Sequence, residues 1–371
     1  MNTYGHASGR RSGFTLIELL TVIFIIGILI AILVPSLNAA RRSAKSAATS
    51  ATIRAVATGT EMFKNENEKD YSRTNGYPPS SAHPRLRDQN DQEFFDDADS
   101  AEGRYPYVQS GGTYPVAYGA QWIVTMLMGA DLQGYVRPSS VPEKLAGKPE
   151  EWYLPDQNGE LLPRNSLYLD PSKVQVVMTR DLPGTPPTRR SNNPSMFPDW
   201  DQNNFDDPAG KLQVITDSFD TPILYYAASR GASTRNLIEP DHLPGNDYSN
   251  MGGTPFYFHQ DNRGFTGYEE NHRAGEPSYP GWNFGGGGNH PLAWVGEDLK
   301  IDKIDEFQKT FAFFIHDEKA HDASEALYRS GNRNNLPLRA RNGDSFILLS
   351  PGADGLYGTP DDVSNLAPNS R

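Results

Sequence analysis

The chain has no cysteine among its 371 residues. Disulfide bonds, thiolate metal sites and cysteine nucleophiles are therefore excluded. A domain without disulfides must obtain local rigidity from other interactions, and a bound cation is one of them.

A basic surface for nucleic acid is also missing. The formal net charge is −12, and it is unevenly distributed. Residues 1–70 carry eight Lys and Arg against five Asp and Glu, so residues 71–371 carry −15. Such an acidic body repels phosphate groups, and we expect no nucleic-acid partner.

The familiar patterns of catalytic sites are absent as well. The four glycines at 285–288 lack the spacing and the GK[ST] ending of a phosphate-binding loop. The segment "HDEKAHD" at 316–322 does not match the HExxH pattern of metalloproteases, and we interpret it as a solvated helix surface. The sequence therefore gives no reason to expect an enzyme.

One long apolar run is present near the N-terminus. Phe14 to Leu33 is 20 residues with a single charge, and a helix of that length spans ~30 Å, the thickness of a bilayer core. Arg10 and Arg11 precede it, so a cleaved secretory signal is the alternative. The run exceeds the usual ~7–15 residues, and "SLNAA" at 36–40 places a bulky leucine where cleavage needs a small residue. We favour a retained, single-pass membrane helix.

The single charge in this run is Glu18. A charged residue deep in a membrane helix costs roughly 2.5–3.5 kcal/mol on insertion scales. Either Glu18 lies near the interface and reaches the headgroups, or it pairs with a positive group at a similar depth.

The stretch "GFTLIELL", Gly13 to Leu20, resembles the type III signal of type IV pilins and of the pseudopilins of type II secretion systems. The resemblance implies a leader of residues 1–13, cleavage by a prepilin peptidase between Gly13 and Phe14, and N-methylation of Phe14. It also implies that the Glu18 carboxylate meets the N-terminal amine of a neighbouring subunit, so that assembly offsets both charges.

The helix is expected to continue beyond Pro35, which predicts a kink or a locally weak point, as far as about residue 66. We assign residues 14–37 to a transmembrane and assembly helix, and residues 38–70 to its periplasmic amphipathic half. Within this half, one line of apolar residues is suited to docking on a globular body, and a line of alanines permits close helix packing. The apolar line is Ile53, Val56 and Phe63; the alanines are Ala40, Ala44, Ala48, Ala51 and Ala55. An ordinary amphipathic linker helix is the alternative.

Residues 71–371 are expected to form a globular head. Helices are predicted at 117–132 and near 303–314, and residues 75–103 are predicted to be an exposed loop. The stretch "DSFDTPILYY" at 217–226 resembles the "DPWG-x-P-x-x-Y" segment that leads into the small sheet of major pseudopilins, with Phe219 and Asp220 replacing tryptophan and glycine. Five strands are predicted, at 173–179, 211–216, 222–229, 255–260 and 345–350.

The C-terminal segment "LLSPGADGLYGTPDDVSN", 348–365, combines glycines with hard oxygen ligands, which suits calcium better than zinc. It is not an EF-hand, because the spacing of its acids differs. It resembles the calcium loop of major pseudopilins. On that resemblance the ligands are Asp354, Asp361 and Asp362, together with Ser350.

Together these features predict an α+β pilin fold, in which a long N-terminal helix packs on a small antiparallel sheet with loop-rich insertions. The resemblance implies a structural subunit in the bacterial inner membrane, with its head in the periplasm. Its partners would be its own copies, related pseudopilins, a prepilin peptidase and an inner-membrane secretion platform. The head is larger than in major pseudopilins because of the regions near 75–210 and 230–300. An adhesive type IV pilin, a minor tip pseudopilin and a membrane-tethered binding or enzymatic domain remain alternatives.

Overall fold

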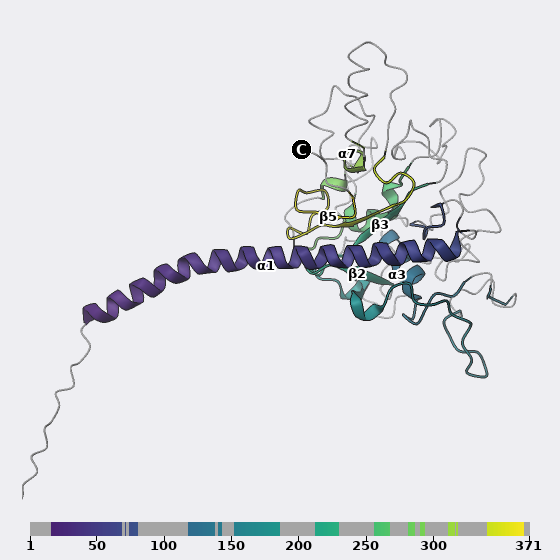
Figure 1. Cartoon of the computed structure of the whole chain (residues 1–371), viewed down its shortest axis with the longest axis horizontal. Coiled ribbons are helices and arrows are strands. Elements are labelled where there is room, and N and C mark those ends of the chain that lie inside the picture. The colour runs from purple at the N-terminus through teal and green to yellow at the C-terminus, as the bar shows by residue number, and fades with distance from the viewer. Residues whose placement is uncertain are drawn as a thin grey trace, which may run out of the picture. The chain divides into compact units, whose positions relative to one another are not determined.

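The computed structural model describes residues 16–68, 71, 74–80, 118–137, 140–142, 152–185, 212–229, 256–267, 281–285, 290–293, 311–315, 317 and 340–366. A long N-terminal apolar helix is followed by small antiparallel sheets, so the α+β class with a pilin-like layout is confirmed (Figure 1). The chain divides into two compact units, residues 1–47 and residues 48–371. The second unit contains the last part of the long helix together with the head.

The long helix is α1, Leu16–Asn67. It continues through Pro35, whose ring nitrogen has no hydrogen to donate to the carbonyl one turn back. The Ser36 hydroxyl donates a hydrogen bond to the Leu33 carbonyl at 2.8 Å, which gives this turn a side-chain contact to its backbone. The expected helix from Phe14 to about residue 66 is confirmed from Leu16 onward.

From Ala48 onward, one face of α1 is buried in the head. The buried residues recur every three or four positions, as the interior face of a helix requires; they are Thr49, Ile53, Val56, Gly59, Thr60, Phe63 and Asn67. The predicted docking line of Ile53, Val56 and Phe63 is at most 2% exposed. Of the alanine line, Ala40, Ala44, Ala48 and Ala51 are exposed and Ala55 is partly buried.

Two contacts fix the end of α1. At Gly59 a Cβ atom would lie 2.8 Å from the Tyr168 carbonyl oxygen, so only glycine lets the chain approach this closely. At the C-terminus, the Arg137 guanidinium donates to the Glu66 carbonyl at 3.0 Å and to the Asn67 side-chain oxygen at 3.1 and 3.2 Å. A cation here complements the negative end of the helix dipole.

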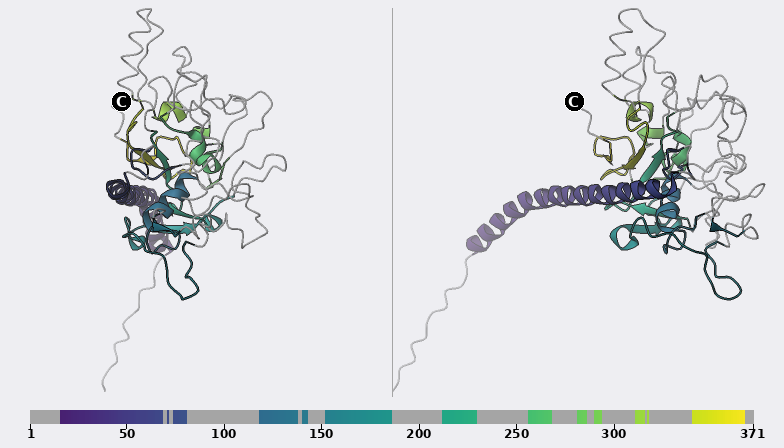
Figure 2. Two further views of the ribbon diagram at one scale, coloured as in Figure 1. Left: turned by 90° about the vertical axis from the view of Figure 1, so that its right-hand side faces the viewer. Right: turned by 45° about the vertical axis from the view of Figure 1, so that its right-hand side comes forward.

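The second helix of the head is α3, Gly119–Met128, within the predicted 117–132. All ten of its residues are buried, and its neighbours include β2 and β3 (Figure 2). Asn262 holds its first turn: the Asn262 side chain accepts from the Ala120 N–H at 2.9 Å and donates to the Tyr225 carbonyl at 2.7 Å. The helix stops at Gly129, which has a φ of 80°.

The head contains two small antiparallel sheets. β1, Gln175–Met178, pairs with β2, Gln213–Thr216. The other sheet has the order β3–β4–β5, from Leu224–Ala227, Phe346–Ser350 and Val363–Ser364. Leu224 faces Leu349, and Ser350 faces Val363. The four predicted strands that correspond to β1 to β4 are confirmed, whereas the two residues of β5 were too few to predict.

The two longer strands of the three-stranded sheet, β3 and β4, are buried on both faces. Alternate residues of β3 and β4, such as Tyr225 and Leu348, belong to a first core shared with α3 and with Ile53, Val56 and Phe63 of α1. The other alternate residues, Leu224, Tyr226, Ile347 and Leu349, belong to a second core with Tyr257, Phe265, Trp282, Leu292, Phe311 and Tyr357. Several residues of the second core come from the region near 230–300, which therefore covers the sheet face opposite α1.

One prediction for the head is wrong, and another differs from the structure in its described part. Of the predicted strand at 255–260, the described residues 256–260 are not a strand: the Phe256 carbonyl accepts a hydrogen bond from the Ser229 N–H at 3.0 Å, and the chain then turns into a 3₁₀ helix at His259–Asn262. The aromatic side chains that suggested a strand fill the second core instead. Of the predicted exposed loop at 75–103, only residues 75–80 are described; they form an irregular segment, as predicted, but Tyr77 is 3% and Ser80 5% exposed, so this part is buried. Residues 81–103 lie outside the described residues.

The remaining described elements are short. Of the predicted helix near 303–314, only residues 311–314 are described, and they belong to α7, Phe311–Ile315. The others are α5, Arg263–Thr266, and the 3₁₀ turns Pro171–Lys173, Thr179–Asp181 and Pro291–Ala293.

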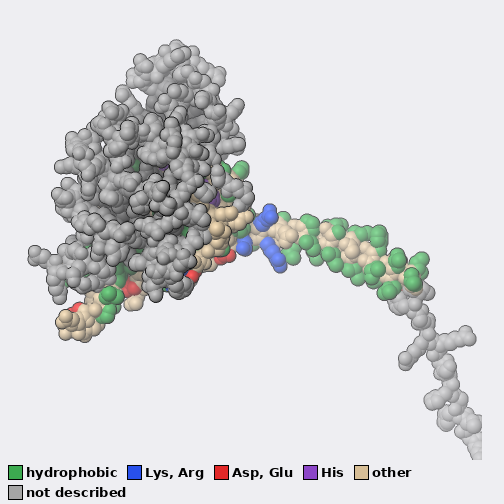
Figure 3. Space-filling view, turned by 180° about the vertical axis from the view of Figure 1, so that it is seen from behind, with side chains coloured by type: hydrophobic (Ala, Val, Ile, Leu, Met, Phe, Trp, Pro, Cys, Tyr) green, Lys and Arg blue, Asp and Glu red, His purple; other side chains and the backbone are tan. Residues whose placement is uncertain are grey.

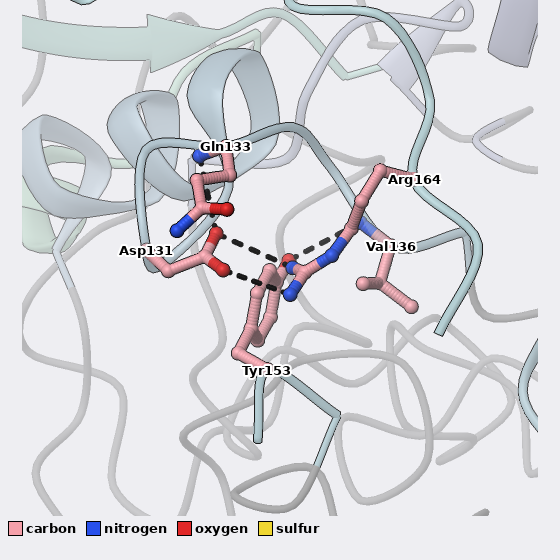
Figure 4. Close-up of polar contacts among 5 residues, drawn as sticks. All are labelled: Asp131, Gln133, Val136, Tyr153 and Arg164. Carbon is pink, nitrogen blue, oxygen red and sulfur yellow. Dashed lines mark hydrogen bonds and ion pairs between the residues drawn. The ribbon is translucent and has the colours of Figure 1, made fainter. Parts of the chain in front are cut away.

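A polar clamp joins the chain after α3 to residues 152–165 (Figure 4). Two Arg164 guanidinium nitrogens donate to the Asp131 carboxylate at 2.8 and 3.3 Å, and the guanidinium lies 4.6 Å from the centre of the Tyr153 ring. The Tyr153 hydroxyl accepts from the Val136 N–H at 3.3 Å, and burial raises the pKa of Tyr153 to about 12. The paired charges thus connect these two segments without a disulfide.

Replacing Gly59 tests the close packing of α1 on the head. Gly59→Ala gains ~1 kcal/mol of helix propensity, but the clash with the Tyr168 carbonyl costs more, about 1–3 kcal/mol. We therefore expect a net lower stability of the head, measured by thermal unfolding of the full chain in detergent. Thr58→Ala, on the exposed side of the same turn, is the control and should stay within about 0.5 kcal/mol of wild type. A Gly59→Ala protein that is more stable than wild type would contradict the packing.

Candidate functional site

The first half of α1 presents an apolar surface that the single chain leaves exposed. Its most apolar 18-residue window has a mean hydropathy of 3.1, and none of that window is buried. Figure 3 shows apolar side chains along this part of the helix. Large apolar side chains from Leu16, 81% exposed, to Leu37, 46% exposed, contribute to it. Length and composition allow this helix to cross a membrane.

Glu18 lies in the first turn of α1 and is exposed in the single chain. A carboxylate in the first turn complements the positive end of the helix dipole. Gly13 and Phe14, the residues of the predicted processing site, lie outside the described residues. The pairing of Glu18 with a neighbouring N-terminal amine therefore stays a prediction.

At the other end of the chain, Ser350 is the last residue of β4 and lies against Asp217. The Ser350 hydroxyl donates a short hydrogen bond to one Asp217 carboxylate oxygen. The other oxygen accepts from the N–H groups of Phe219 at 2.8 Å and Thr221 at 3.0 Å. Burial raises the pKa of Asp217, which is only 1% exposed, and the hydrogen bonds act against this shift. Asp217 thus joins the 217–222 turn to the start of the C-terminal loop.

The same turn contains Asp220, which replaces the expected glycine. Asp220 has a φ of 65°, in the left-handed region that favours glycine. Its carboxylate accepts a hydrogen bond from the Gln175 side chain at 3.0 Å. This backbone conformation explains why the resembling segment has glycine at this position. Aspartate tolerates the conformation better than most other residues.

Asp354 and Asp361 are brought together in the C-terminal loop. The Asp361 Oδ2 atom accepts from the N–H groups of Ala353 at 2.8 Å and Asp354 at 3.2 Å, and Oδ1 accepts from the Thr359 hydroxyl at 2.7 Å. Burial acts to raise the pKa of Asp361, but these hydrogen bonds outweigh it and the pKa is lowered. Burial raises the pKa of Asp354, and the neighbouring Asp361 charge adds to the shift. The two carboxylates thus repel each other unless a proton or a cation is shared.

Asp362 lies deeper than its neighbour. One of its carboxylate oxygens accepts from the Gly358 N–H at 2.7 Å and the other from the Thr359 hydroxyl at 3.3 Å. Burial raises its pKa well above the ordinary value. This side chain therefore holds the 358–362 turn closed.

The donor set in this loop consists of oxygen atoms, which suits a hard cation such as calcium. The adjacent carboxylates of Asp354 and Asp361 are the best matched to one, because a divalent cation would offset their repulsion. Within the described part of the chain, no group of three or more His, Cys, Asp or Glu side chains is placed to hold a metal ion. The four-residue ligand set stays a prediction.

Residues that the sequence did not identify hold the loop against the head. The Tyr357 N–H donates to His290 Nδ1 at 3.2 Å, and the Tyr357 carbonyl accepts from the Leu292 N–H at 3.1 Å. The Tyr357 hydroxyl donates to the Pro222 carbonyl at 2.8 Å. His290 also contacts the Trp282 carbonyl through Nε2 at 2.7 Å, so it is neutral with its proton on Nε2. Burial lowers the pKa of His290 to about 4.

Residues 8–34 match the family model described as the prokaryotic N-terminal methylation motif. No curated protein and no solved structure matches the chain. The match includes Gly13, Phe14 and Glu18, and it ends within the apolar half of α1.

The motif and the exposed apolar helix together indicate a type IV pilin-like prepilin. Proteins with this motif are structural rather than enzymatic, and it implies processing by a prepilin peptidase and assembly with other pilin subunits. A single N-terminal apolar helix fits a membrane-anchored protein of this kind.

The buried histidine gives a prediction for pH. Between about pH 6.5 and 4 the unfolded chain binds a proton at residue 290 that the folded chain does not, so the free energy of unfolding falls as the pH falls. The loss is at most ~1.4 kcal/mol per pH unit and on the order of 2–3 kcal/mol in total.

His290→Gln, which keeps an acceptor and a donor, is the comparison. The difference in unfolding free energy between wild type and this variant should shrink as the pH falls from 7.5 to 4.5, as measured by thermal melting. The buried carboxyls of Asp217 and Asp362 act in the opposite direction in both proteins, so they cancel in the difference. A difference that does not change with pH would contradict the neutral, buried state of His290.

Proposed function

We propose that this protein is a pseudopilin-like structural subunit of a type II secretion filament, processed after Gly13 and assembled through α1. The head lies in the periplasm, and the apolar half of α1 lies in the inner membrane before assembly. Its partners are further copies, related pseudopilins, the prepilin peptidase and the inner-membrane secretion platform.

The observation that carries this proposal is the fully exposed apolar half of α1 in a chain whose residues 8–34 match the methylation motif. Such a surface is stable either in lipid or against similar helices. The choice of a pseudopilin over a pilus subunit is supported by the two head segments that resemble major pseudopilins. These segments meet in the structure through the hydrogen bond from Ser350 to Asp217.

The leader assignment predicts the start of the mature protein. N-terminal sequencing or mass spectrometry of protein produced with a prepilin peptidase should find methylated Phe14 as the first residue. Gly13→Leu should block cleavage and leave residues 1–13 attached. A mature protein that begins elsewhere would remove the leader assignment.

The pairing of charges predicts a selective defect at Glu18. Glu18→Ala should be processed and inserted normally, but it should assemble poorly, because the new N-terminal amine of a neighbouring subunit would remain without its partner in an apolar surrounding. Glu18→Gln, which keeps the size and removes the charge, should behave in the same way. The measurement is filament yield after shearing and sedimentation, with processing followed on gels. Normal yield from both variants would sink the pairing.

Calcium is the second part of the proposal. A cation between the Asp354 and Asp361 carboxylates would stabilise the folded head, because it binds the folded loop and not the unfolded chain. The Thr359 hydroxyl holds the Asp361 side chain in place through its hydrogen bond, and the Gly358 N–H holds Asp362 beside it.

Adding calcium at about 100 times its dissociation constant should stabilise the head by roughly 2–3 kcal/mol. A chelator should reverse the rise in melting temperature, and Asp354→Ala with Asp361→Ala should abolish it. Asp156→Ala, in an exposed loop elsewhere in the head, is the control and should keep the response. An unchanged melting temperature of the wild type with calcium and with chelator would rule calcium out.

A further inference from the structure

Three basic residues lie on α1 where its apolar surface ends. They are Arg41, Arg42 and Lys45, and all three are exposed in the single chain. Figure 3 shows Lys and Arg side chains grouped at this place on the helix. Positions 41 and 45 are about one helical turn apart and position 42 adjoins them, so the three charges share one side of the helix. In the described part of the chain, neither Arg41 nor Arg42 takes part in an ion pair.

The uncharged stretch before this basic cluster has the length of a bilayer core. Residues 19–40 contain no Lys, Arg, Asp or Glu. A helix of that length extends about 33 Å, and the hydrocarbon core of a bilayer is ~30 Å thick. When this stretch lies in hydrocarbon, Arg41 and Arg42 therefore lie at the level of the lipid phosphates on one side, and Glu18 lies at the headgroups on the other side.

The distribution of basic residues around the helix is unusual for a simple membrane anchor. Lys and Arg within about 15–20 residues of a membrane helix usually favour the cytoplasmic side. With the orientation proposed above, the leader contributes Arg10 and Arg11 on that side, and cleavage removes both. The three cations of the basic cluster lie on the opposite, periplasmic side. Orienting the helix therefore does not explain this cluster, whereas binding of an anionic group at that surface does.

We propose that Arg41, Arg42 and Lys45 bind the phosphate groups of anionic phospholipids in the periplasmic leaflet of the inner membrane. The proposal rests on the anchoring and orientation proposed above and adds a lipid partner. A guanidinium group donates paired hydrogen bonds to phosphate oxygens, and the ammonium group adds a third positive charge. This contact fixes the depth of the unassembled subunit, with Glu18 at the opposite headgroups before a neighbouring amine reaches it. A subunit that enters a filament must release these lipids.

The lipid preference of the processed, full-length protein in vesicles tests this contact. Phosphatidylcholine vesicles contain a trace of spin-labelled phosphatidylglycerol or of spin-labelled phosphatidylcholine, and the motionally restricted fraction of each label measures its association with the protein. In about 0.1 M salt, phosphatidylglycerol should associate at least roughly twofold more strongly than phosphatidylcholine. The preference should fall in about 1 M salt, where charges are screened within ~3 Å. It should disappear in Arg41→Gln with Arg42→Gln and Lys45→Gln.

Two control variants separate the charge at this place from other effects. Arg41→Lys with Arg42→Lys keeps both charges and should keep the preference. Arg54→Gln removes an exposed charge about 14 Å farther along α1 than Lys45, which exceeds the screening length of ~10 Å in 0.1 M salt, and it should keep the preference too. The melting temperature of the head should equal that of wild type in every variant, because all the substituted side chains are exposed.

Three results would overturn the proposal. The first is equal association of the two lipids with wild type, the second is a preference that survives in the triple variant, and the third is a preference that Arg54→Gln abolishes. Failure of the proposed function is recognised separately, because filament yield and cleavage after Gly13 are measured without reference to lipid. A lipid preference at the basic cluster in a protein that never forms filaments would support the lipid contact and contradict the proposed function alone.

Discussion

The structure depends on an apolar helix surface that the chain does not cover by itself. The side chains of α1 from Leu16 to Leu37 are exposed, whereas from Ala48 onward one face of the same helix is buried in the head. A single subunit can keep the first surface out of water only in a bilayer, and an assembled subunit can do so against other copies. Both states use the same residues, so transfer from membrane to filament need not change the fold of the head.

The head is organised around a three-stranded sheet whose two longer strands, β3 and β4, are buried on both faces. One face packs on α3 and on Ile53, Val56 and Phe63 of α1. The other is covered by residues such as Tyr257, Trp282 and Phe311 in the second core. The described residues of the region near 230–300 thus have a structural role. They bury a sheet face and, through His290 and Leu292, they also hold Tyr357 of the C-terminal loop.

The elements with a strong local pattern could be predicted from the sequence. The apolar run, the docking line on α1, the helix at 119–128 and four of the strands carry regular spacing or β-branched and aromatic residues. The segment 255–260 carries the same residue types as a strand, but its aromatic rings fill the second core and its backbone turns at His259. The contact of Ser350 with Asp217 joins residues 133 positions apart, and that of His290 with Tyr357 joins residues 67 positions apart. A local sequence pattern cannot predict such contacts.

The measurement that tests the central claim most directly uses the absence of native cysteine. In the full chain, Leu20→Cys is combined in turn with a cysteine at each of positions 24 to 40, all of which are exposed on α1, and the membranes are treated with an oxidant while filaments form. If copies assemble through shifted apolar helices, at least one pair gives a ladder of cross-linked products beyond the dimer, while each single cysteine gives dimers at most. No ladder from any pair, in cells that contain the processed protein, would contradict assembly through α1.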